Sequence, residues 1–317
     1  MRRRASANAS LAGVGSYRPP LRVGNEEIAR RIDSTEEWIV ARSGIATRGV
    51  ALGESVVDMA VDAAAKALAT AGVDAAEVGL VLLATCSMPG PLPGGAPQVA
   101  ARLGASRAGA SDVGAGCAGF TYALSMAADA VRSGSATHVV VVGSERLTDL
   151  VDQDDRGTAF LFGDGAGAVV VSRSDVEGIG PVVWAHDGDQ HARLSISGQT
   201  RHIAMEGRAI YRWATTALPQ LARDACVRAG INLNDLAAFV PHQANLRITE
   251  SVVASLDLAP SVVVARDVVD SGNTSAASVP LALDRLRELG QIGTGDHVLL
   301  LGFGAGLTAA GQVVQIP

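Results

Sequence analysis

Cysteine is scarce in this chain of 317 residues, which contains only Cys86, Cys117 and Cys226. The number is odd, and no two of the three have the Cys-x-x-Cys spacing. This argues against a disulfide framework and against a structural zinc site.

Long apolar runs are also missing. No apolar stretch reaches the roughly 20 residues that a membrane-spanning helix needs. Met1–Arg4 resembles the start of a signal peptide, but Ala5–Ser10 supplies no apolar core to follow it. We therefore expect a protein of the reducing cytoplasm that makes no contact with a membrane.

The chain has no excess of positive charge. Its 26 basic and 32 acidic residues give a net charge of −6, so the bulk charge gives no indication of nucleic-acid binding. A hydrophobic content of 48% with 18% charged residues is typical of a compact globular protein. The length is sufficient for a sizeable core, either as one large domain or as two halves.

Strand patterns alternate with helical patterns along the chain, which favours an α/β layered protein with mostly parallel strands. Val78–Thr85 and His138–Gly143 are predicted to be buried strands. Thr158–Gly167 and Val169–Ser172 are predicted to form a hairpin punctuated by glycine.

The second half of the chain repeats the pattern of the first. Three pairs of positions carry the repeat, at offsets of 158, 156 and 159 residues: Gly72 and Gly230, Cys117 and Asn273, and His138 and His297. We therefore predict two equivalent α/β halves, residues 1–172 and 173–317, with a site at their junction. Residues 173–205 have no visible counterpart and are predicted to be a surface insertion that caps the site.

Cys117 lies in a turn of small residues, within Asp112–Phe120, ahead of a predicted buried helix at Ala118–Arg132. Unpaired N–H groups at a helix N-terminus favour negative charge, so we expect a lowered thiol pKa and a nucleophilic thiolate. The alternative is a buried cysteine that acts as a small hydrophobic residue.

Two polar residues stand at the equivalent strand–helix junctions of the second half. His242 ends a predicted strand, and Asn273 opens a predicted helix. Alone, each is typical of a packed or turn residue. Together with Cys117 they suit Claisen chemistry on thioesters, in which a thiolate holds an acyl group. The other two side chains would then donate hydrogen bonds to the enolate that forms when a β-carboxylate leaves as CO2.

Five segments together resemble the β-ketoacyl-ACP synthase III family of the thiolase-fold superfamily: Asp112–Phe120, Phe162–Ala168, Val240–Ile248, Gly272–Ser278 and Gly302–Gly306. The resemblance covers nearly the whole chain, in order. It implies a thiolase-like α/β fold, duplicated in five layers α-β-α-β-α, and a homodimer. It also implies an acyltransferase that condenses an acyl-CoA starter with malonyl-ACP, giving β-ketoacyl-ACP, CoA and CO2. Such a reaction starts fatty-acid or polyketide chains and needs no metal and no permanently bound cofactor.

The resemblance assigns roles to the central residues. It implies that Cys117 is the acylated nucleophile, while His242 and Asn273 carry decarboxylation and condensation. It places the backbone N–H groups of Cys117 and Ala305 in an oxyanion hole, and it places Phe303 beside the nucleophile. The glycines of Gly302–Gly306 do not make a dinucleotide motif, because their spacing is wrong and too few residues follow for a βαβ unit.

Further positions match residues that bind substrates in the family. The resemblance implies that Trp38 and Arg156 sandwich the adenine of coenzyme A, with Arg42 and Ser34 on the same segment. An aromatic face and a guanidinium plane suit a purine. A packed Trp38 and a solvated Arg156 are the alternative.

The carrier protein has its own candidate contacts. Arg212 and Arg247 match basic residues that receive the acidic acyl carrier protein, a partner that positive charge would steer.

Two features depart from the family pattern. Asp187–Met205 is shorter than the matching family segment, and Leu92 stands where many relatives present a bulkier aromatic to the acyl pocket across the dimer interface. We therefore expect a pocket more open than that of an acetyl-specific enzyme. The segments Asp33–Gly44, Gly178–Pro181 and Met205–Trp213 resemble priming ketosynthases of actinomycete aromatic polyketide pathways.

Two other functions stay open on the residues alone. In the first, Cys117 passes its acyl group to a hydroxyl, an amine or a carrier thiol without forming a carbon–carbon bond, and His242 acts as general base. The presence of Asn273 favours condensation over this reaction. In the second, the chain is a catalytically idle scaffold, which the complete set of three residues disfavours.

Overall fold

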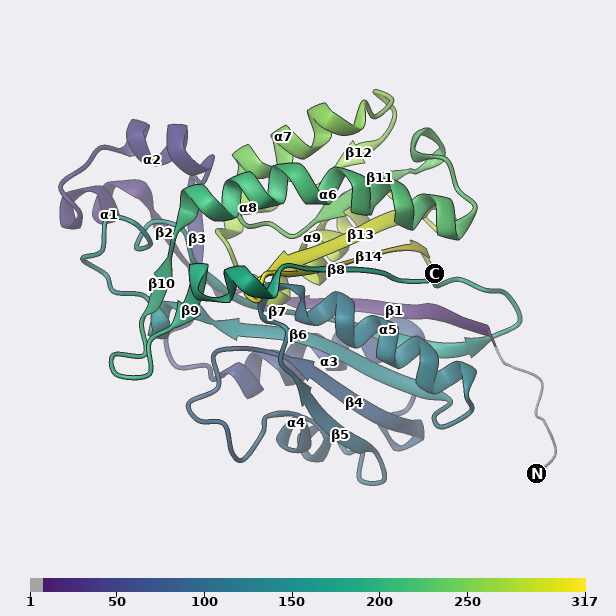
Figure 1. Cartoon of the computed structure of the whole chain (residues 1–317). Coiled ribbons are helices and arrows are strands. Elements are labelled where there is room, and N and C mark those ends of the chain that lie inside the picture. Colours follow the sequence, from purple (N-terminus) through teal and green to yellow (C-terminus); the bar gives the residue numbers. More distant parts are fainter. Residues whose placement is uncertain (1–7) are drawn as a thin grey trace.

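The computed structural model describes residues 8–317, and in them two five-stranded sheets are stacked on one another (Figure 1). The first sheet is built from β1 (Asn8–Tyr17), β4 (Val78–Ala84), β5 (Gly109–Val113), β6 (His138–Arg146) and β7 (Asp164–Ser174). The second is built from β8 (Val183–His186), β11 (Ala238–Pro241), β12 (Val263–Val264), β13 (His297–Gly304) and β14 (Thr308–Gln315). Their strand orders are β1-β7-β6-β4-β5 and β12-β11-β13-β14-β8.

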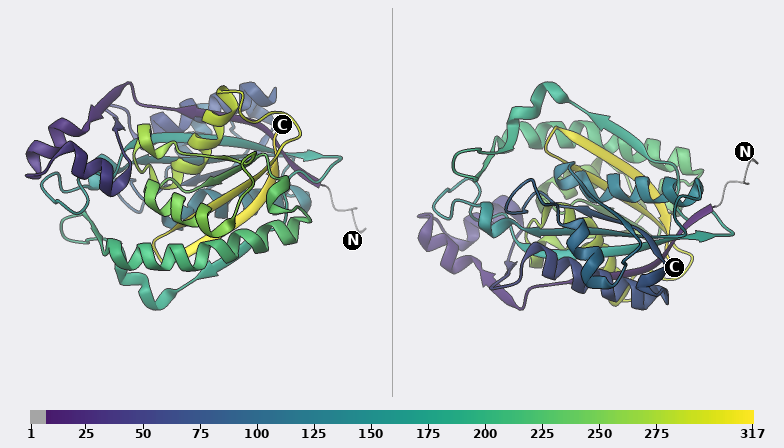
Figure 2. Two further views of the ribbon diagram at one scale, coloured as in Figure 1. Left: turned by 90° about the horizontal axis from the view of Figure 1, so that it is seen from above. Right: turned by 90° about the horizontal axis from the view of Figure 1, so that it is seen from below.

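Helices form three further layers (Figures 1 and 2). A central layer between the sheets contains α5 (Gly119–Arg132) and α9 (Ser278–Glu288), and its apolar residues pack with both sheets in one cluster. The outer face of the first sheet is covered by α3 (Val56–Ala71) and α4 (Ala96–Leu103). The outer face of the second is covered by α6 (Gly207–Ala229) and α7 (Leu246–Leu256). The predicted five-layer α-β-α-β-α architecture is thereby confirmed.

The two sheets are copies of one another. Read from the opposite end, the second sheet has the order β8-β14-β13-β11-β12, which matches β1-β7-β6-β4-β5 strand for strand. Each has two parallel and two antiparallel neighbouring pairs. The predicted duplication is confirmed, and the prediction of mostly parallel strands is wrong. A parallel neighbour needs a crossover of about a dozen residues, usually helical, whereas only residues 305–307 join β13 to β14.

The predicted hairpin over Thr158–Gly167 and Val169–Ser172 is also wrong. Residues 158–161 form turns, and from Asp164 onwards the chain is one long strand, β7, which pairs antiparallel with both β1 and β6. Its glycines serve packing, because a Cβ at Gly167 would lie 2.7 Å from the Cβ of Pro280 in α9. Glycine in a strand can mark such a close approach as readily as a turn.

The segment 173–205 is only partly an insertion. Within it, β8 pairs with β14 at the edge of the second sheet, where it is the counterpart of β1. The rest forms a 3-10 turn at Gly188–Arg193 and a small hairpin of β9 (Leu194–Ile196) and β10 (Ile203–Met205).

A smaller group of elements lies beyond the ends of the sheets (Figure 1). It contains β2 (Leu21–Gly24), α1 (Asn25–Arg31), α2 (Glu36–Ser43), β3 (Thr47–Val50) and α8 (Val268–Ser271). None of the helices within residues 8–317 is long and apolar enough to cross a membrane.

Candidate active site

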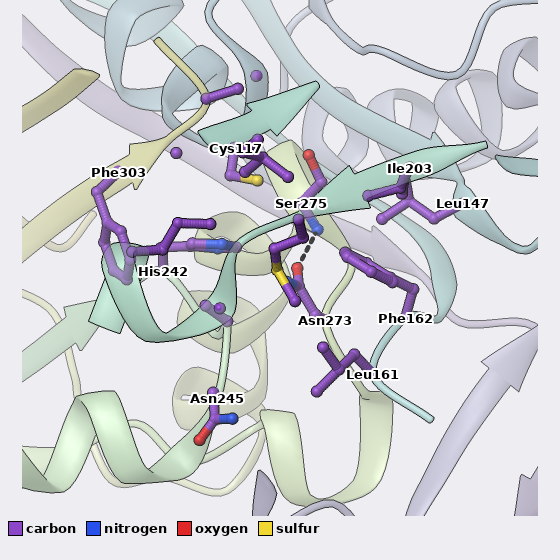
Figure 3. Close-up of a pocket in the computed structure, with 18 of the residues that line it drawn as sticks. Cys117, Leu147, Leu161, Phe162, Ile203, His242, Asn245, Asn273, Ser275 and Phe303 are labelled. Atoms are coloured by element: carbon purple, nitrogen blue, oxygen red, sulfur yellow. Dashed lines mark hydrogen bonds between the residues drawn. The ribbon is translucent and has the colours of Figure 1, made fainter. Parts of the chain in front are cut away.

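A cavity of about 330 Å³ brings Cys117, His242 and Asn273 together (Figure 3). His242 follows directly on β11 of the second sheet, and Cys117 and Asn273 lie in the turns that lead into α5 and α9. The duplication thus places equivalent junctions of both halves around one space, as predicted.

Cys117 is held against the end of β13. It lies in a 3-10 turn at Gly116–Ala118 that leads into α5, and it is 9% exposed. A Cβ at Gly304 would lie 2.8 Å from the Cβ of Cys117, so only glycine allows the strand to approach this closely. Ala305 follows at once and lines the cavity beside the cysteine.

The thiol of Cys117 does not have the lowered pKa that its sequence position predicts. Burial raises the pKa of Cys117 to about 11; a contact with Ser275 opposes this shift, and nearby Glu145 adds to it. The prediction is corrected because removal from water disfavours the thiolate more than the helix N-terminus favours it. The resting Cys117 is therefore a neutral thiol.

His242 is buried and oriented on both sides. Its backbone N–H donates to the Leu301 carbonyl of β13 at 2.7 Å, and its Nδ1 lies 2.6 Å from the Oγ of Ser278. The ring packs edge-on against Phe303, with 5.0 Å between the ring centroids. Burial lowers the pKa of His242 to about 3. The imidazole is therefore neutral at physiological pH and offers one donor and one acceptor.

Asn273 is fixed by its own turn. Its backbone bridges to the chain at Phe162, with the Asn273 N–H donating to the Leu161 carbonyl at 2.8 Å. Its Oδ1 accepts from the backbone N–H of Ser275, also at 2.8 Å. Because the oxygen is occupied, the amide NH2 is the group left for a ligand.

Apolar side chains form most of the remaining wall. They come from the loop after β6, from the β9–β10 hairpin and from the start of α6: Leu147, Leu161, Phe162, Leu194, Ile196, Ile203, Met205 and Ile210. Phe303 also lines the cavity. Leu92 does not line it, because this side chain is 86% exposed on the loop after β4. The predicted role of Leu92 lies across a dimer interface and stays a prediction, and its exposed position leaves it free for such a contact.

A second cavity of about 620 Å³ adjoins the first. Both are lined by the same five residues: Leu161, Met205, Gly207, Tyr211 and Asn245. Together the two cavities make a path from the surface to Cys117.

The outer cavity is rich in arginine. Trp38 has the Arg156 guanidinium 5.0 Å and the Arg42 guanidinium 5.7 Å from its ring centroid. Arg212 and Arg247 line the same cavity, so two groups of residues that were predicted separately meet here. Ser34 does not line it, and its buried hydroxyl has no hydrogen-bond partner in residues 8–317. The prediction that Ser34 binds coenzyme A is thus not supported by its position.

Several residues around the site were not predicted from the sequence. Glu145 is fully buried and accepts hydrogen bonds from the Ser87 hydroxyl at 2.5 Å and from the Cys86 N–H. Burial raises the pKa of Glu145. Cys86 lines the cavity, with its Sγ 3.8 Å from the Oγ of Ser275. The segment Gly272–Ser278 could have pointed to its serines, whereas nothing in the local sequence marks Glu145.

Comparison with known proteins identifies the family. Residues 111–188 match the family described as 3-oxoacyl-[acyl-carrier-protein (ACP)] synthase III, and residues 226–316 match the family described as its C-terminal part. Together they cover more than half of the chain.

Individual relatives match over almost the full length. The chain is 50% identical to β-ketoacyl-[acyl-carrier-protein] synthase III 4 of Streptomyces coelicolor, covering 97% of this chain and 98% of that protein. It is 47% identical to synthase III 1 of the same organism, covering 98% of this chain and 96% of that protein. The crystal structure of the priming β-ketosynthase from the R1128 polyketide biosynthetic pathway superposes with a TM-score of 0.98. That pair is 47% identical, and the match covers 100% of this chain and 98% of the other. The chain therefore belongs to the β-ketoacyl-ACP synthase III family, the acyltransferases that condense an acyl-CoA starter with malonyl-ACP to prime fatty-acid or polyketide synthesis.

Proposed function

We propose that Cys117 is the nucleophile of this condensation and that His242 and Asn273 carry its decarboxylation step. The observation that supports this most is the meeting of the three side chains in one largely apolar cavity, at the end of a path from the surface. A water-poor cavity strengthens the few hydrogen bonds that it offers to a developing charge.

In the first half-reaction the acyl group moves from coenzyme A to Cys117. A Cys117 S–C bond forms, the bond from the acyl carbon to the CoA sulfur breaks, and the proton of the Cys117 thiol goes to the departing CoA. The N–H groups of Cys117 and Ala305 are proposed to stabilise the oxyanion. Their place on one cavity wall, where Gly304 meets the cysteine, supports that role.

In the second half-reaction malonyl-ACP loses CO2. The electron pair of the broken C–C bond becomes an enolate on the thioester, which His242 and Asn273 stabilise by donating hydrogen bonds. The enolate carbon then attacks the acyl carbonyl, a new C–C bond forms, and the bond to the Cys117 sulfur breaks. The thiolate takes up a proton, and β-ketoacyl-ACP leaves.

The outer cavity is proposed to receive the carriers. Trp38 and Arg156 would clamp the adenine of coenzyme A, with Arg42 close to the same ring. Arg212 and Arg247, on the same rim, would meet the acidic carrier protein. Charge reversal at Arg247 should therefore weaken the binding of malonyl-ACP more than the binding of acyl-CoA. Arg173→Glu, on the exposed end of β7, is the matched control.

The starter is proposed to be larger than acetyl and the pathway to be a polyketide pathway. The short β9–β10 segment and the absence of an aromatic at Leu92 support the first proposal. Similarity to a protein described as a priming β-ketosynthase of a polyketide pathway supports the second. A strong preference for acetyl-CoA over all longer acyl-CoAs would contradict a more open pocket.

A homodimer is proposed as the working state. In the described residues β5 is an edge strand, and an open edge is a template for pairing with a second copy. Leu92 stands exposed nearby in the chain, where a partner would cover it. Leu92→Asp should shift the sedimentation coefficient towards that of a monomer.

The free thiols of all three cysteines support a reducing, cytoplasmic location.

The deciding experiment is intact-protein mass spectrometry with a panel of acyl-CoAs, followed by malonyl-ACP. We expect an adduct on Cys117 that disappears as β-ketoacyl-ACP and CO2 form, and no adduct in Cys117→Ala. A stable adduct untouched by malonyl-ACP would contradict condensation and favour acyl transfer to another acceptor.

A further inference from the structure

Ser278 contacts His242 from outside the lining of the cavity. It is the first residue of α9 and is 1% exposed. Its Oγ lies 2.6 Å from the Nδ1 of His242 and accepts a hydrogen bond from the Gln243 N–H at 3.2 Å. Ser278 therefore holds two consecutive residues at the end of β11.

These contacts select one of the two neutral forms of the histidine. The Ser278 oxygen already accepts from Gln243, and Nδ1 of His242 is the one acceptor that residues 8–317 place within reach of the Ser278 hydroxyl hydrogen. If Nδ1 carried the proton, both groups would be donors along the same line, and the serine O–H would be buried without an acceptor. An unsatisfied buried donor costs about 1–3 kcal/mol. The favourable arrangement has Ser278 donating to Nδ1, which leaves the ring proton on Nε2.

We propose that Ser278 is a positioning residue that holds His242 as the neutral Nε2–H tautomer and so turns a hydrogen-bond donor towards the acyl cavity. The proposal rests on the function proposed above, because a donor at Nε2 is what an enolate oxygen requires. It places the effect of Ser278 and His242 in the second half-reaction, in which malonyl-ACP loses CO2, and not in the acylation of Cys117.

The arrangement parallels that of Asn273. There the backbone N–H of Ser275 occupies the amide oxygen and leaves the NH2 group free to donate. At His242 the Ser278 hydroxyl occupies the acceptor nitrogen and leaves Nε2–H free to donate. In both cases a serine of the segment Gly272–Ser278 removes the accepting atom, so that two neutral donors face the substrate.

Two-bond proton–nitrogen NMR of the histidine-labelled enzyme tests the tautomer directly at neutral pH. His242→Gln identifies which of the six histidine signals belongs to this ring. We expect a protonated, pyrrole-type Nε2 and an unprotonated, pyridine-type Nδ1 in the unmodified enzyme. The opposite pattern would overturn the proposal, whatever the behaviour of any variant. Because this measurement uses no substrate, its result is independent of whether the enzyme condenses malonyl-ACP.

Kinetics then test the consequence. Ser278→Ala should lower malonyl-ACP decarboxylation about tenfold, the loss expected for one hydrogen bond of this kind, and shift the His242 signals towards mixed tautomers. Acylation of Cys117 should change less than twofold, and Ser278→Thr, which keeps the hydroxyl, should restore the signals. Ser43→Ala is the matched control, because Ser43 is also buried and also donates one hydrogen bond and accepts another, away from the cavity. The proposal would be overturned if Ser278→Ala left the His242 signals and the decarboxylation rate unchanged. It would also be overturned if Ser43→Ala changed both to the same extent as Ser278→Ala.

Discussion

The backbone N–H of Ser275 donates to the side-chain oxygen of Asn273 at 2.8 Å, and this contact settles which end of the amide is free. The oxygen is engaged within the turn, so the NH2 group is the end left to donate to a ligand. Ser275 reaches this position with a φ of 46°, a conformation that few residues other than glycine adopt. Such local strain is common where a site must be held in one geometry.

The variant Asn273→Asp tests the roles of the amide oxygen and the amide NH2 group separately. A carboxylate still accepts from Ser275, so the turn is kept, but the donor to the enolate is lost and a negative charge faces it. We expect decarboxylation of malonyl-ACP to fall by about 10²–10³-fold, as when one oxyanion donor is removed. Acyl transfer to Cys117, followed by intact mass, should persist. Equal loss of both half-reactions would show that Asn273 is needed for the fold of the site and not for the enolate.

The buried state of His242 predicts an acid-dependent loss of stability. Its pKa is about 3 in the folded protein against an ordinary value of 6.5. Between these values the unfolded chain binds a proton that the native protein does not, so stability falls as pH falls. The slope for one proton is about 1.4 kcal/mol per pH unit. Denaturant unfolding from pH 7 to pH 4 should therefore show a steeper decline than in His242→Gln, and parallel curves would contradict a neutral buried ring.

The resting thiol of Cys117 predicts a slow, pH-dependent reaction with alkylating agents. Because burial raises the pKa of Cys117 to about 11, the thiolate fraction increases through the whole range from pH 6 to pH 10. The rate of iodoacetamide modification, mapped to Cys117 by peptide mass, should increase about tenfold per pH unit without a plateau. A plateau beginning below about pH 8 would contradict the raised pKa and support the activated thiolate that the helix position alone predicts.

The close contact between β13 and Cys117 can be tested with one methyl group. In Gly304→Ala the new Cβ would lie 2.8 Å from the Cβ of Cys117, so one of them has to move. Overpacking of this kind costs about 1–3 kcal/mol of stability. We also expect acylation of Cys117 to slow at least tenfold. Gly293→Ala is the control, because no atom lies within 4 Å of a Cβ there; equal behaviour of the two variants would exclude a role for the contact.

The aromatic and guanidinium pair at the outer cavity predicts a binding effect without a chemical one. Trp38→Ala should raise KM for acyl-CoA about tenfold, within the range for loss of a base-stacking platform. Arg156→Ala should raise it about two- to fivefold, as for one partly exposed cation–π contact. Arg30→Ala on the exposed side of α1 is the control. Unchanged KM with lowered kcat would place both residues outside the coenzyme A site.

Much of the fold could be predicted from local pattern. The repeat at Gly72 and Gly230, where each helix ends in the left-handed conformation, reflects a local requirement for glycine. The alternation of apolar strands and helices predicts the layered architecture, because each element must bury its apolar face against another. The direction of β7 could not be read in this way. Its glycines fit both a turn and a strand, and the pairing of β7 with β1 and β6 in the folded sheet shows that the strand applies.

The chemistry of the site divides along the same line. The residue types and their places in turns ahead of helices follow from the sequence: Cys117 precedes α5, His242 lies between β11 and α7, and Asn273 precedes α9. Their protonation states, and the serine that fixes the ring of His242, depend on burial and on contacts between residues far apart in the sequence, such as His242 with Ser278 and Cys117 with Ser275. Desolvation is a property of the folded environment and not of the residue. The sequence by itself therefore determined which groups meet, and the tertiary structure decided that they meet as a neutral thiol, a neutral imidazole and an amide with its donor free.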